Sequence, residues 1–280
     1  MIFTTRFAPS PTGPLHLGHA YSALLAYDMA RAADGRFLVR IEDTDISRAR
    51  PKWEAQIYDD LIWLGLQWEQ PVLRQSEHLE HYNSELMHLA AMGLIYPCSC
   101  KRNDIRAAMS APQEGVPALT VYPGTCRHRD MNSRQPGDAL RLNMARALKH
   151  ITGQQMEFHE TGPAHAGTHK ISQQDLQHSI GDAVLGRKEI ETVSYMLAAV
   201  VDDAKQNITT IIRGEDLFDT TALQVLLQTL LTLPTPLYHH HRLIRDDTGK
   251  RLAKRDDARA ITKYRADGLT PNDIRSQLGL

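Results

Sequence analysis

Three prolines within six positions limit what the start of this chain can form. Residues 6–19 read Arg-Phe-Ala-Pro-Ser-Pro-Thr-Gly-Pro-Leu-His-Leu-Gly-His. Proline fixes φ and has no N–H group, so no helix can run through this stretch. Residues 2–7 are expected to form a strand, and the apolar periodicity of residues 17–33 predicts a helix that ends at a left-handed Gly35. A strand, a stiff turn and a helix therefore follow one another in close succession.

His16 and His19 lie where the expected helix begins. A spacing of three residues places two side chains on one face of a helix. The free N–H groups and the positive dipole end of a helix N-terminus favour phosphate, and imidazoles there can donate to phosphate oxygens as charge develops. Gly18 leaves room for a flat adenine. The spacing indicates an ATP site, although two helical histidines are more often surface residues.

The charge of the chain gives no sign of a global positive field for nucleic acid. The formal net charge is −1 and the sequence pI is about 6.9. Contacts with RNA must therefore use local basic patches. Residues 127–149 and 242–265 are the two candidates, with a solvated charged face as the alternative for the first.

The chain carries no signal for a membrane or a secretory route. No apolar run approaches the roughly 20 residues that span a bilayer, and the N-terminus lacks a basic start followed by a long apolar stretch. Three cysteines, an odd number, argue against a disulfide scaffold. We expect a soluble, cytoplasmic protein without an obligate protein partner.

Strand and helix signals alternate along the first part of the chain. Residues 35–41 are expected to form a second strand, residues 51–64 a helix, and residues 76–92 a helix capped by Ser76 and ended by Gly93. A polar stretch rich in Gly, Pro and His follows. The apolar pattern then returns in residues 195–201, 208–213 and 220–231. This order predicts an α/β fold whose parallel sheet is divided by an inserted module.

A second motif, Gly-Lys-Arg-Leu-Ala-Lys-Arg, spans residues 249–255 after a strand expected through residues 242–244. The ammonium group of Lys254 is a point charge on a flexible stem, which suits a loop that neutralises phosphates as it closes. Alone, such a basic run is more often a solvated turn. Its occurrence in the same chain as the His16 and His19 segment favours the functional interpretation.

Residues 6–19 resemble, position for position, the signature of class I glutamyl-tRNA synthetases and their shortened relatives. In that family His16, Gly18 and His19 would occupy the "HIGH" motif. Residues 249–255 resemble the mobile "KMSKS" loop. The resemblance implies a Rossmann-type parallel sheet with an inserted zinc-containing, acceptor-like module and a short C-terminal helical segment.

The same resemblance implies ATP as a substrate, with Mg²⁺. Its catalytic residues would be His16, His19 and Lys254, and ATP would be bound by His16, Gly18, His19, Arg251 and Lys254. Arg251 stands for the first lysine of the loop, and Ala253 stands for its serine. Ala253 lacks a hydroxyl that could brace the loop, so ATP affinity or loop closure is expected to suffer.

The family holds L-glutamate at positions that this chain retains, namely Arg6, Phe7, Ala8, Pro9, Ser10, Glu42, Tyr195 and Arg213. By this resemblance Arg6 and Arg213, with the Tyr195 hydroxyl, would contact carboxylate oxygens, and Glu42 would bind the ammonium group. Both Arg6 and Glu42 end expected strands and should open toward the carboxyl edge of the sheet. For Asp43 and Asp45 a plain capping turn is the favoured alternative, and Tyr195 could be a core residue.

Cys98, Cys100 and Cys126 offer three thiolates and leave one tetrahedral position open. Three buried thiols are an equal alternative from this spacing alone. The shortened relatives carry Cys-x-Cys followed by Tyr-x-x-x-Cys, so the resemblance implies one structural zinc ion with Tyr122 as its fourth ligand. His128 is the competing ligand, because imidazole is the commoner zinc donor.

The resemblance also implies a domain division: a Rossmann catalytic domain in two halves (1–94 and 181–240), an insertion (95–180), and the loop with a truncated helical segment (241–280). Only 25 residues follow Arg255, too few for a separate anticodon-binding domain. We therefore expect glutamate activation followed by transfer to queuosine at the wobble position of tRNA(Asp). Three alternatives stay open: charging of a tRNA 3′ end, a nucleotidylyltransferase, and a non-catalytic RNA-binding paralogue.

Overall fold

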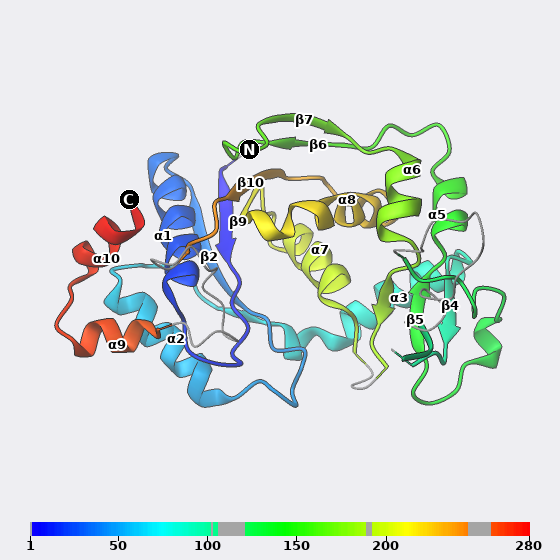
Figure 1. Cartoon of the computed structure of the whole chain (residues 1–280), viewed down its shortest axis with the longest axis horizontal. Helices are drawn as coiled ribbons and strands as arrows, with labels where there is room; N and C mark the ends of the chain where they lie inside the picture. Colours follow the sequence, from blue (N-terminus) through cyan, green and yellow to red (C-terminus); the bar gives the residue numbers. More distant parts are fainter. Residues whose placement is uncertain (1, 102, 106–120, 189–191, 246–258) are drawn as a thin grey trace.

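The computed structural model describes residues 2–101, 103–105, 121–188, 192–245 and 259–280. Within these residues the strands form three sheets (Figure 1). The first is parallel, in the order β1 (Thr4–Phe7), β2 (Arg36–Ile41) and β3 (Leu73–Arg74). The second has the order β7 (Gly167–Lys170), β6 (Glu157–Glu160), β10 (Leu237–His241) and β9 (Thr210–Gly214). The two sheets adjoin, because β1 lies beside β9 and the Thr209 N–H group donates to the Thr4 carbonyl at 2.9 Å.

The predicted strand, turn and helix at the N-terminus are confirmed. Helix α1 (Leu17–Ala32) follows β1 and buries its apolar side chains against β1 and β2. One detail of its end is wrong: the left-handed residue is Asp34 (φ 47°), not Gly35. Glycine is needed at 35 for another reason, since a Cβ atom there would lie 2.3 Å from the Phe3 carbonyl oxygen.

The next two helices also form close to their expected bounds. Helix α2 (Pro51–Trp63) starts with proline. Helix α3 (Leu79–Ala91) follows a 3₁₀ turn (Gln75–His78), and the left-handed Gly93 ends it. Ser76 does not cap α3 as predicted; its N–H and hydroxyl groups donate to Asp43 at 2.8 and 2.6 Å. Asp43 therefore accepts from a residue 33 positions away, rather than forming only the local capping turn that was the favoured alternative.

The third sheet lies at the opposite end of the molecule from α9 (Ile261–Ala266) and α10 (Pro271–Leu278) (Figure 1). It is antiparallel, in the order β4 (Ile95–Cys98), β5 (Ala139–Leu142) and β8 (Val184–Gly186), and the short α5 (Met144–His150) follows β5. A 3₁₀ turn (Met131–Ser133) precedes β5, and α6 (Gln173–Asp175) with a π turn (Leu176–Ile180) precedes β8.

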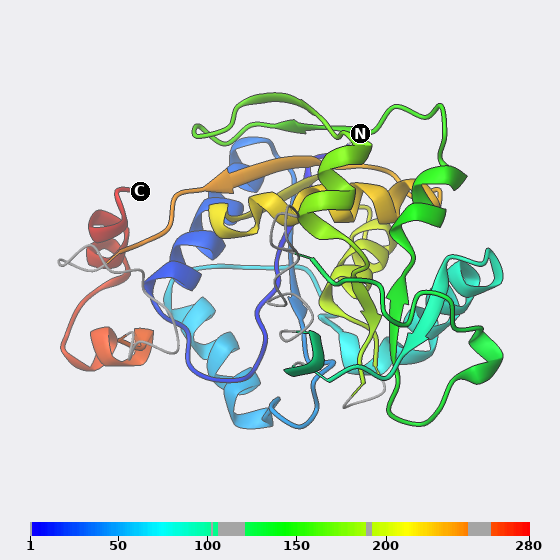
Figure 2. The ribbon, with the colours of Figure 1, turned by 45° about the vertical axis from the view of Figure 1, so that its right-hand side comes forward.

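Strand pairing does not follow the expected boundary at residue 180. The β6–β7 hairpin lies before that boundary, yet β6 pairs in parallel with β10 of the catalytic sheet (Figures 1 and 2). Conversely, β8 lies after it and pairs with β5. The division into domains as a whole stays a prediction.

Two helices complete the second half. Helix α7 (Tyr195–Lys205) precedes β9, and α8 (Thr221–Leu230) follows a 3₁₀ turn (Glu215–Thr220). The strand expected through residues 242–244 is instead β10, which ends at His241. None of the helices in the described part of the chain is long and apolar enough to cross a membrane.

Candidate active site

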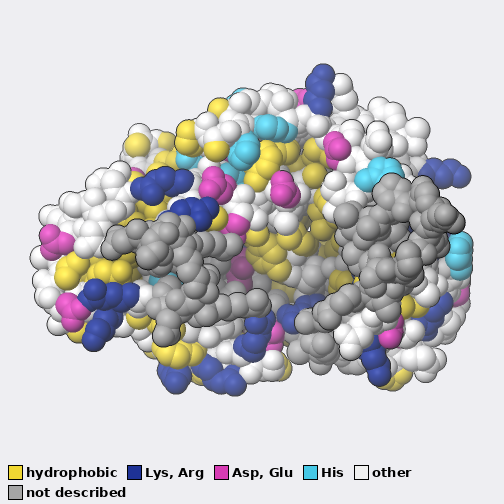
Figure 3. Space-filling model, in the orientation of Figure 1, with side chains coloured by type: hydrophobic (Ala, Val, Ile, Leu, Met, Phe, Trp, Pro, Cys, Tyr) yellow, Lys and Arg dark blue, Asp and Glu magenta, His cyan; other side chains and the backbone are white. Residues whose placement is uncertain are grey.

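A cavity of about 450 Å³ lies at the carboxyl ends of β1, β2 and β9. This is where ligands bind in open α/β sheets, and the volume suits a small molecule. Figure 3 shows that this face of the molecule is hollowed near its centre. The cavity is lined by every position predicted for glutamate and for the HIGH-like motif: Arg6, Phe7, Ala8, Pro9, Ser10, His16, Gly18, His19, Glu42, Tyr195 and Arg213. Sequence analysis missed other lining residues, among them Thr12, Ser22, Asp216, His241 and Leu243.

Hydrogen bonds fix the rings of the two histidines at the start of α1. His16 is the N-cap, and its Nδ1 accepts from the Gly18 N–H group at 3.1 Å; the His19 Nδ1 accepts from the His16 N–H group at 3.2 Å. Their ring centroids are 3.8 Å apart. Because Nδ1 is an acceptor in both neutral rings, the proton of each lies on Nε2. The Gly18 N–H group is therefore used within the helix cap, and the Nε2 atom of each ring carries the proton.

The cap leaves little room for a side chain at position 18. A Cβ atom there would lie 3.0 Å from Cε1 of His16. That contact is tight enough to push the imidazole away from the Gly18 amide. The glycine therefore serves the capping geometry as well as leaving space above the helix.

An ionic cluster forms the buried end of the cavity. Arg6 donates to both carboxylate oxygens of Asp203 at 2.8 and 3.2 Å, and Arg40 donates to the same group at 2.7 Å. Burial alone would raise the pKa of Asp203, but the two guanidinium groups lower it. Sequence analysis missed Arg40, on strand β2, and Asp203, on helix α7, because a charged residue within a strand or a helix gives no sign of complete burial.

Glu42 is the next acidic side chain of this cluster. Its Oε1 is buried, has no hydrogen-bond partner among the described residues and lies 3.5 Å from Nη2 of Arg40. Burial raises the pKa of Glu42 to about 7, despite attraction from Arg40 and Arg6. A buried carboxylate without a donor is a place where an ammonium group can bind. Burial, and then the charge of Glu42, raise the pKa of Tyr195, so its hydroxyl stays protonated.

Arg213 is held by four acceptors. Its Nε donates to Nε2 of His240 at 2.9 Å, Nη1 to Oε1 of Gln224 at 2.6 Å, and Nη2 to Oγ1 of Thr221 at 2.8 Å and to the Leu217 carbonyl at 3.2 Å. The guanidinium is buried on β9 and lines the cavity. Such a fixed planar group can recognise a carboxylate with defined geometry.

His240 connects Arg213 to Glu160. The Nδ1 atom of His240 lies 2.5 Å from Oε2 of Glu160, whose Oε1 accepts from the His240 and Gly162 N–H groups at 2.9 and 2.6 Å. Burial and the charge of Arg213 lower the pKa of His240 to about 4. The neutral ring therefore donates from Nδ1 to Glu160 and accepts at Nε2 from Arg213.

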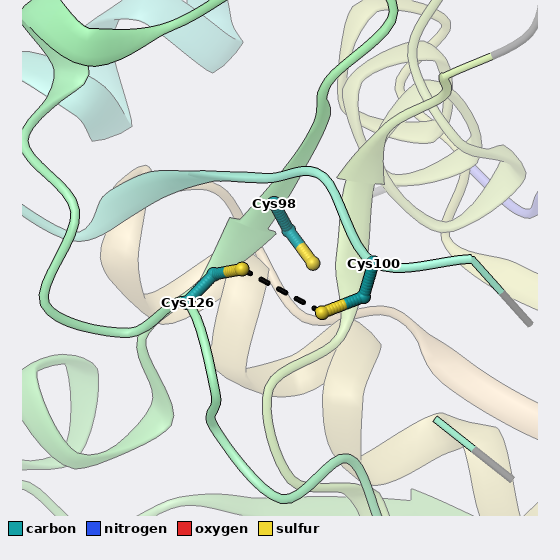
Figure 4. Close-up of side chains that lie close together, drawn as sticks. All are labelled: Cys98, Cys100 and Cys126. Atoms are coloured by element: carbon teal, nitrogen blue, oxygen red, sulfur yellow. Dashed lines mark hydrogen bonds between the residues drawn. The ribbon is translucent and has the colours of Figure 1, made fainter. Parts of the chain in front are cut away.

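The three cysteines converge beside β4 (Figure 4). Their Sγ atoms lie within 4.8 Å of one another, and Cys100 and Cys126 are 3.6 Å apart. The Tyr122 hydroxyl oxygen lies 3.4 Å from Sγ of Cys98 and 3.5 Å from Sγ of Cys100. Burial would raise the pKa of Cys126, but hydrogen bonds from Tyr122 and the Ser99 backbone lower it to about 6.

The Cys100–Cys126 distance and the two distances from the Tyr122 oxygen are close to those around a tetrahedral zinc ion. Zinc–sulfur and zinc–oxygen bonds of about 2.3 and 2.0 Å give separations of about 3.8 Å between sulfurs and about 3.5 Å between sulfur and oxygen. Tyr122 is buried at this distance, whereas the rival His128 is exposed and is not part of the cluster.

Most described arginines of segment 127–149 have internal partners. Arg127 donates to Asp182, Arg129 to Asp138, and Arg141 to the Asp182 carbonyl. These contacts favour a structural role over a free RNA-binding patch for this segment. In the second basic segment, Arg242 donates to the Leu278 carbonyl and Arg265 to Asp59, while the core of the segment lies outside the described residues.

Arg251, Ala253 and Lys254 lie outside the described residues. The residues on either side of that segment do lie at the cavity. Ile244 lines it, and Ala260 forms a β-bridge with His16.

The chain is similar to known proteins over almost its whole length. Residues 3–280 match the family model of class I tRNA synthetases (E and Q), catalytic domain. The glutamyl-Q tRNA(Asp) synthetase of Rhodobacter capsulatus is 57% identical over 279 residues, which cover 99% of each chain. That of Nocardia farcinica is 37% identical and is covered to 82% of its length.

Solved structures agree with this fold. A glutamate tRNA ligase from Elizabethkingia meningosepticum, in complex with its amino acid, superposes with a TM-score of 0.78 at 26% identity. The present chain spans 61% of that protein. Methionyl-tRNA synthetase of Mycobacterium tuberculosis shares the fold alone, with a TM-score of 0.64 at 11% identity. The chain therefore belongs to the class I glutamyl- and glutaminyl-tRNA synthetase family, among the glutamyl-Q tRNA(Asp) synthetases, and is a class I aminoacyl-tRNA-synthetase-like ligase.

Proposed function

We propose that this enzyme activates L-glutamate with ATP and Mg²⁺ and transfers glutamate to queuosine at the wobble position of tRNA(Asp). In the first step the glutamate α-carboxylate attacks the α-phosphorus of ATP, and pyrophosphate leaves. In the second step a queuosine hydroxyl attacks the adenylate, and AMP leaves. The observation that carries the proposal is 57% identity over 99% of both chains to a relative named for this activity.

The cavity supports binding of glutamate by the residues predicted for it. Arg6 and Arg213, with the Tyr195 hydroxyl, would contact carboxylate oxygens. Glu42 would bind the α-ammonium, which supplies the partner that its buried Oε1 lacks among the described residues. Ammonium binding favours the ionised carboxylate, so it would lower the pKa of Glu42 from about 7.

The HIGH-like motif would bind the triphosphate of ATP beside glutamate. The Nε2–H groups of His16 and His19 would donate to the α-phosphate as charge grows on its oxygens. Lys254 and Arg251 would neutralise the leaving pyrophosphate, as charged groups of a closing loop. Gly18, which has no side chain, would leave space for the adenine ring.

We also infer that Cys98, Cys100, Cys126 and Tyr122 hold one zinc ion in a structural role. A fourth protein ligand closes the tetrahedral site and leaves no open position for catalysis. The ion would link β4 to the loop that contains Tyr122 and Cys126.

Metal analysis should find about one zinc ion per chain, since four protein ligands surround one ion. Cys126→Ser should lose the ion and lower the melting temperature. Tyr122→Phe removes one oxygen and keeps the ring, so it tests the fourth ligand alone. Unchanged zinc content and affinity in that variant would show that Tyr122 is not a ligand; His128→Ala is the matched control and should retain the metal.

The acceptor can be tested with radioactive glutamate and defined tRNA. Label should attach to tRNA(Asp) that contains queuosine and should survive removal of the 3′-terminal adenosine. It should not attach to tRNA(Asp) with unmodified guanosine at that position. Label on the 3′ end of tRNA(Glu) would establish ordinary aminoacylation instead. Pyrophosphate exchange separates the other two alternatives. Exchange that does not depend on an amino acid would favour a nucleotidylyltransferase. Absence of exchange would favour a non-catalytic paralogue.

A further inference from the structure

The three buried arginines near the cavity differ in whether they are paired with a carboxylate. Arg6 and Arg40 both donate to the Asp203 carboxylate, at 2.8 and 2.7 Å. Arg213 contacts no carboxylate among the described residues. Its four acceptors, here named the Arg213 cage, are all neutral: the His240 imidazole, the Gln224 amide, the Thr221 hydroxyl and the Leu217 carbonyl. Two of these three cations are thus already paired with a carboxylate, and Arg213 is not.

His240 keeps a carboxylate away from Arg213. Glu160 bonds to Nδ1 of His240, and Arg213 bonds to Nε2 on the other side of the same ring. The carboxylate is further fixed by two backbone N–H groups, and both side chains are fully buried. Glu160 can thus orient the imidazole, and through it the guanidinium, without neutralising the guanidinium by direct contact.

We propose that the Arg213 cage determines selectivity for a carboxylate side chain, by orienting Arg213 with neutral acceptors only and so leaving its charge for the substrate. This inference rests on the proposed function, because it takes glutamate as the ligand of Arg213. A guanidinium paired with a protein carboxylate would favour an incoming carboxylate much less. His240, Gln224 and Thr221 are therefore positioning residues, which act through Arg213.

Gln224 offers the sharpest test, because Gln224→Glu exchanges one amide nitrogen for oxygen. Its Oε1 accepts from Arg213 at 2.6 Å, whereas its buried Nε2 has no hydrogen-bond partner among the described residues. The substitution brings a carboxylate against Arg213 and removes an unsatisfied donor. A structural residue would lose stability on substitution; here we expect stability to be kept and substrate affinity to be lost.

The experiment is glutamate-dependent pyrophosphate exchange by the full chain, with melting temperature measured in parallel. Gln224→Glu should raise the KM for glutamate roughly 30-fold or more, the low end of losses for buried charge pairs, with little change in the KM for ATP. The preference for glutamate over glutamine should fall, and the melting temperature should equal or exceed that of the parent protein. Arg213→Ala gives the reference for complete loss of the cation.

Gln228→Glu is the matched control. Gln228 lies on the same helix one turn later and is equally buried; it donates to the Tyr238 hydroxyl at 3.2 Å, whereas Gln224 accepts from Arg213. This variant should lower the melting temperature and leave the KM for glutamate near that of the parent. Equal glutamate KM values for the two variants would overturn the proposal, whether both rise or neither does.

A second pair keeps the test valid if Gln224→Glu does not fold. In a Glu160→Gln background, His240→Gln keeps a neutral acceptor beside Arg213, and His240→Glu places a carboxylate there. The two double variants differ by one atom type. Only the second should lose glutamate affinity, and similar KM values would contradict the cage. Absence of glutamate-dependent exchange in the parent protein is a distinct result that rejects the proposed function itself.

Discussion

His19→Ala is expected to slow glutamate-dependent pyrophosphate exchange by about 10²- to 10³-fold, the loss typical of one transition-state donor. The Nδ1 atom of His19 accepts from the His16 N–H group, so the proton of the neutral ring lies on Nε2, the atom that we propose donates to the α-phosphate. His16→Ala should act similarly and also lose the N-cap, which is worth about 1 kcal/mol of stability. Steady-state exchange at saturating glutamate and ATP measures the effect.

The control for both variants is an exposed histidine on another helix. His88 lies on α3 and is 58% exposed, so His88→Ala should change neither the rate nor the melting temperature. A His19→Ala enzyme that folds and retains near-parental exchange would remove His19 from the catalytic assignment.

Arg213→Ala is expected to lower kcat/KM for glutamate by roughly 30- to 4,000-fold, which corresponds to 2–5 kcal/mol for an unpaired buried charge. The deficit should appear mainly in the KM for glutamate, because the proposed ATP-binding residues do not include Arg213. Arg213→Lys should not restore activity, since one ammonium cannot satisfy the spread acceptors of the Arg213 cage and also contact the substrate.

Substrate selection tests the same assignment. Glutamine should be rejected by the parent enzyme, because it leaves the charge of Arg213 without a carboxylate. Aspartate differs by one methylene, which simple pocket fit discriminates by only about 1–3 kcal/mol, so its rejection depends on the fixed reach of the arginines. If aspartate is activated at the same rate as glutamate, Arg213 does not recognise the side-chain carboxylate.

Local structure was predictable wherever neighbouring residues decide it. The prolines between β1 and α1 exclude a helix whatever the rest of the chain does, and the left-handed Gly93 ends α3 as expected. The predictions of local structure were wrong where a residue contacts a segment that is distant in sequence. Ser76 binds Asp43 rather than capping α3, and Gly35 serves a close approach to Phe3 rather than a left-handed turn.

The cavity positions were predictable from the resemblance, because signature residues lie at strand ends whose place in a parallel sheet is fixed. The partners of those residues were not. Asp203 is far from Arg6 in sequence, and Glu160 reaches His240 only because β6 pairs with β10. Neither partner belongs to a motif.

The sequence by itself determined the strand, turn and helix that place His16 and His19, the cysteine and tyrosine spacing, and those cavity positions that belong to the family signature. The tertiary structure alone decided which buried charges meet. Parallel pairing joins strands from distant parts of the chain, and burial then requires each charge to find a partner inside. That is why Arg6 pairs with Asp203, while Arg213 bonds to a neutral histidine that separates it from Glu160.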